Sequence, residues 1–149
     1  MIDYESWLQE VPSSLSDDPL WRVQVYRLAL FAADVGWPDV SRLALDGRTR
    51  SLSDQFYRAL GSISANVAEG YSRGSPRDRC RFYEYALGSA RESRDWYYKG
   101  RHVLGESAAA ERMDFLTQII RLLLAMLSQQ RATIVAEEAA DYDSQPAQP

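Results

Sequence analysis

Residues 51–72 read SLSDQFYRALGSISANVAEGYS, and this stretch decides the fold. Its apolar residues recur at spacings of three and four, which is the repeat of one buried side of an α-helix; they are Leu52, Phe56, Leu60, Ile63 and Val67. Gly61 costs up to about 1 kcal/mol relative to Ala in mid-helix, so we expect it to mark a close approach between two helices. The stretch therefore predicts an amphipathic helix.

A second helix is predicted upstream, over residues 20–35. Asp17-Asp18-Pro19 places capping acids and a first-turn proline at its start, and Gly36-Trp37-Pro38 is expected to stop it. Residues 37–50 are then expected to form a polar connection to the next helix.

Two further helices are predicted downstream. Ser75-Pro76-Arg77-Asp78 combines an N-cap, a first-turn proline and a capping box, and it begins a helix that is expected to end near Gly105. The last helix is predicted over residues 107–136, with two adjacent apolar seams. The second seam fits either an oligomer interface or a wide core-facing stripe in a monomer.

The expected fold class is all-α, because the chain has no strand-like alternation and no hairpin signal. Short connections favour antiparallel neighbours, which predicts an up-down-up-down four-helix bundle over residues 18–137. Residues 1–17 and 138–149 are acidic and are expected to be flexible ends.

The length of 149 residues suits one domain. A single cysteine, Cys80, excludes an internal disulfide and a multi-cysteine zinc site, and it favours a reducing compartment. The acidic N-terminus lacks the basic and apolar regions of a signal peptide. The longest apolar run, residues 122–127, is far shorter than the ~20 residues of a membrane span. We therefore expect a soluble cytoplasmic protein that is not bound to a membrane.

The formal net charge of −4 combines 17 basic with 21 acidic residues, which are unevenly placed along the chain. Residues 1–19 and 132–149 hold five and four acids with no base, so residues 20–131 hold all 17 bases against 12 acids, or +5. Sixteen of the bases are Arg, whose planar fork of donors suits phosphate and carboxylate groups. The Arg bias indicates either such partners or the base composition of the genome.

The chain offers few catalytic groups. His102 is its only histidine, which excludes a two-histidine di-iron site, and no serine lies in a G-x-S-x-G motif. Residues 70–75 form either a plain interhelical turn or a phosphate-binding helix start, but no Gly-Lys-Ser/Thr follows. Cys80 is either an ordinary thiol or one whose pKa is lowered by nearby Arg residues. We expect no enzyme activity, no catalytic residue, no metal and no cofactor.

Two motifs resemble a known family. Residues 62–70, SISANVAEG, and residues 83–92, YEYALGSARE, with Ser75 between them, resemble the four-helix-bundle family of 23S rRNA intervening-sequence proteins. That family is related to the accessory variability determinant proteins of diversity-generating retroelements. The resemblance covers about residues 20–131 and implies a ring-like homopentamer with a non-enzymatic role. Its signature positions, which we interpret as packing residues between the helices over residues 51–72 and 75–104, are Asn66, Glu69, Gly70, Ala86, Gly88, Ser89 and Glu92.

The first functional hypothesis is a nucleic-acid or ribonucleoprotein accessory protein. Its basic residues, expected to bind RNA or DNA, are Arg73, Arg77, Arg79, Arg81, Arg91, Arg94, Lys99 and Arg101. Aromatic residues that interleave with them, and that are expected to stack on bases, are Tyr71, Tyr83, Trp96, Tyr97 and Tyr98. Because accessory variability determinants bind nucleic acid and a reverse transcriptase through a basic surface, the resemblance makes a reverse transcriptase a candidate partner.

The alternative hypothesis is a protein–protein scaffold with no direct nucleic-acid binding. The Arg side chains would then pair with carboxylates within or between subunits, and the aromatic residues would fill interfaces. Under the first hypothesis, the two acidic ends are expected to screen the basic surface or to compete for it.

Overall fold

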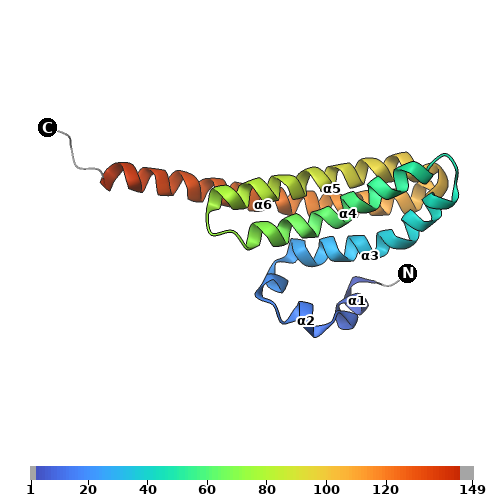
Figure 1. Ribbon diagram of the computed structural model, residues 1–149, viewed down its shortest axis with the longest axis horizontal. Helices are drawn as coiled ribbons and strands as arrows, with labels where there is room; N and C mark the ends of the chain where they lie inside the picture. The colour runs from blue at the N-terminus through green and yellow to red at the C-terminus, as the bar shows by residue number, and fades with distance from the viewer. Residues whose placement is uncertain (1–2, 145–149) are drawn as a thin grey trace.

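The computed structural model describes residues 3–144, and every regular element in that range is a helix (Figure 1). Three short elements come first: α1 (Tyr4–Glu10), α2 (Ser13–Ser16) and the 3-10 helix η1 (Pro19–Arg22). Four long helices follow: α3 (Gln24–Leu45), α4 (Arg50–Tyr71), α5 (Pro76–Leu104) and α6 (Glu106–Ser144). The predicted all-α class is confirmed.

The four long helices lie side by side, and the chain reverses direction at each turn between them (Figure 1). Each packs against the next one along the chain, and α3 also touches α6, though less extensively. Their apolar stripes meet in one core, as stripes with three- and four-residue spacing require. The largest fully buried apolar side chains are those of Val25, Leu43, Phe56, Leu60, Ile63, Val67, Tyr97, Leu116, Ile119, Leu123 and Leu127.

The sequence patterns that define α4 and α5 behave as expected. Four of the five apolar residues in the α4 stripe have no exposed surface, and only Leu52 is partly exposed. At the start of α5, the backbone N–H of Asp78 donates to Ser75 Oγ over 3.2 Å, and Pro76 occupies the first helical position. The predicted cap is therefore confirmed.

Helix α3 differs from expectation, because it passes through Pro38 and ends only at Leu45. A proline in a helix interior costs about 3 kcal/mol. Burial of the turn beyond it offsets this cost, since Leu43 is fully buried and Asp39 is nearly so. The predicted connection over residues 37–50 is thus wrong up to Leu45, and the turn is confined to residues 46–49.

Close helix contacts occur at glycines other than the expected one. A Cβ atom at Gly36 would lie 2.5 Å from Cδ1 of Leu60, and one at Gly70 would lie 2.6 Å from Cε1 of Tyr83. A Cβ atom at Gly61 would have no neighbour within 4 Å. The close approach predicted at Gly61 is therefore wrong, and that position borders a surface groove instead.

The N-terminal segment packs against α3, although residues 1–17 were expected to form a flexible end. Trp7 is 6% exposed, and its Nε1 donates to Asp34 Oδ2 over 2.6 Å. The Trp7 and Tyr4 rings lie 5.4 and 5.2 Å from the ring of Phe31. With Val35 they form a small second core. Aromatic burial therefore holds α1 on the long helices, while residues 1–2 lie outside the described range.

At the other end of the chain, α6 continues to Ser144, past its expected end at residue 136. Figure 1 shows α6 extending as a single helix beyond the turn that joins α4 and α5. Part of the segment expected to be a flexible tail, residues 138–144, is therefore helical, and residues 145–149 lie outside the described range.

The last helix also carries a long apolar stretch. An 18-residue window of α6 has a mean hydropathy of 1.3, so the helix is long and apolar enough to cross a membrane by length and composition alone. The core helix of a soluble protein passes the same test, and α6 supplies Ile119, Leu123 and Leu127 to the core described above. This property by itself assigns no membrane segment.

Candidate functional site

The basic residues expected to bind nucleic acid lie along α5 and in the turn before it, and they do not form one patch. At about 100° per residue, two sides of α5 can be distinguished. Those on the solvent-exposed side, called the outer row below, are Arg77, Arg81, Arg91 and Lys99. Those on the other side, which are only partly exposed, are Arg79, Arg94 and Arg101. Arg73 lies in the turn between α4 and α5.

The partly exposed group makes structural hydrogen bonds. Arg79 Nε donates to a backbone carbonyl of the α4–α5 turn over 2.9 Å. Arg94 Nη1 donates to Thr117 Oγ1 of α6 over 3.1 Å, and Arg101 Nε lies 3.3 Å from a carboxylate oxygen of Glu106. These three side chains connect parts of the fold to one another.

Three of the four side chains in the outer row form exposed ion pairs. Arg77 pairs with Glu138 of α6, whereas Arg81 and Lys99 pair with acids three and four residues earlier on α5. The Arg91 side chain is the exception, because it makes no hydrogen bond or ion pair within residues 3–144. Exposed pairs are worth about 0–1 kcal/mol each, so an anionic partner can replace them at small cost.

Exposed tyrosines accompany the outer row. Tyr83 and Tyr97, which were expected to stack on bases, are 4% and 1% exposed and lie in the core, so they cannot reach a nucleic acid. Trp96 is partly exposed, and the ammonium of Lys99 lies 4.5 Å from the centre of its ring. The exposed tyrosines near the basic residues are Tyr71, Tyr85 and Tyr98.

A polar groove runs beside the outer row, between α4 and α5. Ser62 lies at its centre: Asn66 Nδ2 donates to Ser62 Oγ over 2.8 Å, and Ser89 Oγ lies 3.0 Å from the same oxygen. The groove has a volume of about 270 Å³, and its lining residues are Gln55, Arg58, Ala59, Ser62, Ser89 and Glu92. It presents hydroxyl and amide groups, one guanidinium and one carboxylate to solvent.

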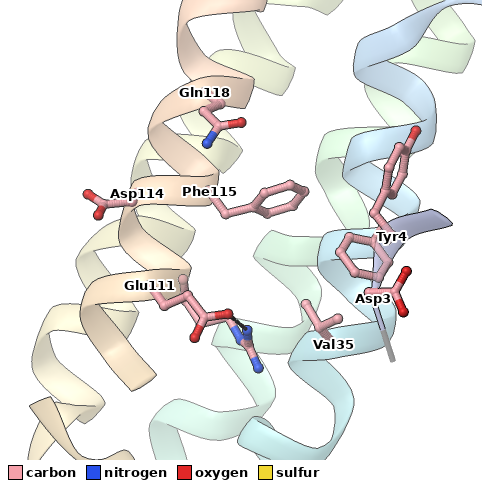
Figure 2. Close-up of a pocket in the computed structure, with 9 residues that line it drawn as sticks. Asp3, Tyr4, Val35, Glu111, Asp114, Phe115 and Gln118 are labelled. Atoms are coloured by element: carbon pink, nitrogen blue, oxygen red, sulfur yellow. Dashed lines mark hydrogen bonds and ion pairs between the residues drawn. The ribbon is translucent and has the colours of Figure 1, made fainter. Parts of the chain in front are cut away.

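A larger pocket of about 430 Å³ lies between α3 and α6, where the start of α1 covers part of the seam (Figure 2). Figure 2 shows the Phe115 ring extending from α6 towards Tyr4, while Asp114 points away. The Phe31 and Phe115 rings meet edge to face, with 5.6 Å between their centres. The pocket is thus an aromatic seam with acidic groups at its edge.

The outer row, the groove and the α6 wall of the pocket all lie in a part of the chain that matches a known family. The model of the 23S rRNA-intervening sequence protein family matches residues 24–128. The chain belongs to this family. No curated protein and no solved structure matches it. The 23S rRNA-intervening sequence protein match begins with α3 and ends within α6, so α1, α2, η1 and the end of α6 lie outside it.

The signature positions of the 23S rRNA-intervening sequence proteins divide into two groups. Gly70 and Ala86 are buried, and they lie on α4 and α5. The other five are exposed or partly exposed: Asn66, Glu69, Gly88, Ser89 and Glu92. A Cβ atom at Gly88 would have no neighbour within 4 Å. The interpretation of all seven as packing residues is therefore wrong for Gly88, and Ser89 and Glu92 line the polar groove.

A buried polar cluster, absent from the sequence-based expectations, connects three helices. Asp39 Oδ2 accepts hydrogen bonds from the Tyr97 hydroxyl at 3.1 Å and from Arg112 Nε at 3.0 Å. Burial, and next the Asp39 carboxylate, raise the pKa of Tyr97 far above its ordinary value. The only signal in the sequence is that an acid, Asp39, follows Pro38, within the residues predicted to form a connection.

The described residues contain no group of three or more His, Cys, Asp and Glu that could hold a metal. His102 is exposed near the end of α5. Cys80 is 8% exposed, and burial raises the pKa of its thiol more than the nearby Arg131 lowers it. The alternative of a Cys80 thiol activated by Arg residues is therefore wrong.

Proposed function

We propose that this chain is a non-enzymatic accessory protein that binds RNA or DNA in a ribonucleoprotein. In this proposal its four long helices form an antiparallel up-down-up-down bundle, which assembles as a homopentameric ring and works in the cytoplasm without binding a membrane. A reverse transcriptase is the candidate protein partner. The outer row of α5, together with its exposed tyrosines, is the nucleic-acid surface.

The observation that carries the proposal is the combination of charge and aromatic groups on one exposed side of α5. The outer row extends from Arg77 to Lys99, which is about 33 Å of helix and about the length of ten nucleotides along a duplex strand. Tyr85 and Tyr98, within this span, are 54% and 53% exposed. Arginine forks suit phosphate groups, and tyrosine rings suit unpaired bases.

The acids on the same side of α5 limit this surface to a weak contact for one copy. Glu84 pairs with Arg131 of α6, and Asp95 pairs with Lys99. Arg91, which has no such partner within residues 3–144, is the residue most available to a phosphate. In a ring the surface repeats around the assembly, and multivalency converts weak contacts into useful avidity.

The test compares two exposed arginines. Arg91 is changed to Ala, and the matched control is Arg121→Ala on α6, because Arg121 is also exposed and also lacks an ion pair within residues 3–144. Binding of a single-stranded RNA is measured over a salt series by gel shift. We expect R91A to weaken binding and to reduce the slope of log affinity against log salt by about 0.7–0.9 per lost phosphate contact. No binding at low salt, or equal effects of both changes, would contradict the proposal.

A protein–protein scaffold is the second candidate, and the polar groove favours it. Ser62 on α4 and Ser89 on α5 give this seam small, partly exposed side chains, and Gly88, next to Ser89, is exposed, which allows another helix to approach. A Gly88→Arg change meets no atom of its own chain near the Cβ. If another subunit covers the seam, Gly88→Arg lowers the mass measured by light scattering, whereas the exposed control Ala125→Arg leaves it unchanged.

One double variant separates the two candidates. Arg77 and Arg81 are changed to Glu, and Arg79 is left unchanged because it bonds the turn before α5. Loss of RNA binding by an assembly of unchanged mass supports the nucleic-acid function. Loss of assembly without an effect on RNA binding supports the scaffold.

A further inference from the structure

A polar pocket of about 440 Å³ lies near the turn that joins α4 and α5, where both helices meet α6 (Figure 1). Its lining residues are Tyr71 at the end of α4, Arg79 and Tyr83 on α5, and Gln130 on α6. Pockets for small ligands measure about 300–1,000 Å³. This one is therefore large enough for a small organic molecule, and the groups that line it decide which class of molecule fits.

The Tyr83 hydroxyl is a polar group on a buried side chain that has no partner in the fold. Tyr83 is 4% exposed, and its ring packs on the backbone of α4 at Gly70, where a Cβ atom would lie 2.6 Å from Cε1 of the ring. The hydroxyl makes no hydrogen bond within residues 3–144. No fully buried side-chain nitrogen or oxygen in that range lacks a partner, so this hydroxyl is open to solvent through the pocket. It is available to bond whatever occupies the pocket.

Arg79 supplies a positive charge and most of the donors. Its Nε donates to the Arg73 carbonyl over 2.9 Å, which fixes the guanidinium at the wall of the pocket. The two Nη atoms have no partner within residues 3–144, so four of the five N–H donors of the side chain remain available. A guanidinium fork of this kind binds phosphate and carboxylate groups through paired hydrogen bonds.

No acid opposes this charge inside the pocket. None of the four lining residues is acidic. The acids within two residues of them along the chain each have a basic partner, and these ion pairs are Glu69 with Arg73, Asp78 with Arg81, and Glu84 with Arg131. Arg79 is in no ion pair within residues 3–144, so the charge that the pocket presents is positive.

The neutral lining groups add further donors. Burial raises the pKa of Tyr83 more than the charge of Arg79 lowers it, so the hydroxyl keeps its proton at neutral pH and can donate. The Gln130 amide and the Tyr71 hydroxyl also have no hydrogen-bond partner within residues 3–144. A phosphomonoester offers three strong acceptor oxygens to such a set, whereas a carboxylate offers two.

We propose that this pocket binds a small phosphomonoester, whose phosphate accepts hydrogen bonds from Arg79, Gln130 and the Tyr83 hydroxyl. Tyr71 is 41% exposed, and a tyrosine ring at a pocket of this kind suits stacking on a base, which favours a nucleoside monophosphate over a sugar phosphate. The outer row does not contribute to the pocket, so this site does not depend on the nucleic-acid binding proposed above.

The first test is calorimetric titration of the full chain at neutral pH with adenosine monophosphate, ribose 5-phosphate and adenosine. We expect both phosphates to bind and adenosine to bind at least about tenfold more weakly than adenosine monophosphate, because it lacks the charge-assisted hydrogen bonds. Tighter binding of adenosine monophosphate than of ribose 5-phosphate identifies the ligand as a nucleotide, and equal binding identifies a sugar phosphate. No binding of either phosphate, or equal binding of adenosine and its monophosphate, overturns the proposal.

The second test removes one hydroxyl. Tyr83→Phe keeps the ring over Gly70, and the matched control is Tyr26→Phe, because Tyr26 is 9% exposed and its hydroxyl also makes no hydrogen bond within residues 3–144. Thermal melts followed by circular dichroism show that both variants fold. We expect Tyr83→Phe to weaken binding of adenosine monophosphate by about tenfold or more, the value of a hydrogen bond to a charged group, and Tyr26→Phe to leave it unchanged. Equal affinities of the two variants contradict the assigned role of the hydroxyl.

The third test adds a charge. Gln130→Glu places a carboxylate in the pocket, and Gln129→Glu places the same group on an exposed neighbour that does not line it. We expect Gln130→Glu to abolish binding of adenosine monophosphate and Gln129→Glu to leave it nearly unchanged; equal losses would overturn the site. Arg91→Ala, the variant expected to weaken RNA binding, should leave nucleotide binding intact, so the pocket and the outer row can fail separately.

Discussion

Replacing Arg112 with Met is expected to destabilise the protein more than any change at the surface. Arg112 and Asp39 are each 7% exposed, and 3.0 Å separates Arg112 Nε from Asp39 Oδ2. The substitution leaves the Asp39 carboxylate buried, with the Tyr97 hydroxyl as its one remaining hydrogen-bond donor among the described side chains. Met has a similar length, so the change removes charge and hydrogen bonds with little loss of packing.

The size of the effect follows from the burial of the pair. Removing one partner of a buried ion pair costs about 3–5 kcal/mol, and the hydrogen bond from Tyr97 places our expectation near the lower end, at about 3 kcal/mol. For a chain of this size, each kcal/mol lowers the melting temperature by about 2–4 °C. The melting temperature is therefore expected to fall by about 6–12 °C. The loss of about 3 kcal/mol is a large part of a typical free energy of unfolding of about 5–15 kcal/mol.

The assay is urea denaturation at neutral pH, followed by circular dichroism, with a control in which all three polar groups are removed. The control carries Asp39→Leu, Tyr97→Phe and Arg112→Met, which removes every charge and hydroxyl of the buried cluster, while the exposed Glu111 loses its pair with Arg112 Nη1 in both variants. Apolar replacement of a buried pair is often neutral or stabilising, so the triple variant should recover most of the lost stability. A loss below about 0.5 kcal/mol for Arg112→Met, as at exposed sites, would refute the reasoning.

Three further outcomes are expected. Gly70→Ala should lower the free energy of unfolding by about 1–3 kcal/mol, because its Cβ atom would lie 2.6 Å from a ring carbon of Tyr83. Gly88→Ala has open space around its Cβ atom and should be neutral or stabilising by up to about 1 kcal/mol. Urea denaturation measures the free energy of unfolding of both variants. Deleting residues 138–149 should strengthen RNA binding in low-salt gel shifts, since it removes three acidic side chains, one of which is paired with the start of α5; weaker binding would contradict the charge argument. Burial raises the pKa of Cys80, so iodoacetamide should modify it at pH 8 much more slowly than it modifies the urea-unfolded chain, and equal rates would show that the thiol is accessible.

Local rules predicted the parts of the fold in which local and tertiary preferences agree. The stripe from Phe56 to Val67 and the cap at Ser75 depend on spacing and on a side-chain hydrogen bond, and both lie within one segment. Pro38 shows where such rules fail. Its cost is local, whereas the burial of Leu43 that offsets it comes from helices far away in the sequence.

The candidate site was less predictable than the fold for a similar reason. The number of basic residues on α5 could be read from the sequence, but their value to a nucleic acid depends on which side of the helix each occupies. Arg94 and Arg91 are equivalent in the sequence pattern, but in the structure only Arg94 donates a hydrogen bond to Thr117 of α6. Asp39 and Arg112 are 73 residues apart, and no spacing rule joins acids and bases at that separation.

The burial of Trp7 moves the N-terminal boundary of the packed structure to a point before the family match. The family match begins at Gln24, but the small core beneath Trp7 includes Phe31 and Val35 of α3. A chain cut at the family boundary would place those side chains in water and leave Asp34 without its indole donor. The packed structure is therefore longer than the part that matches the family model, and the N-terminal segment belongs to it.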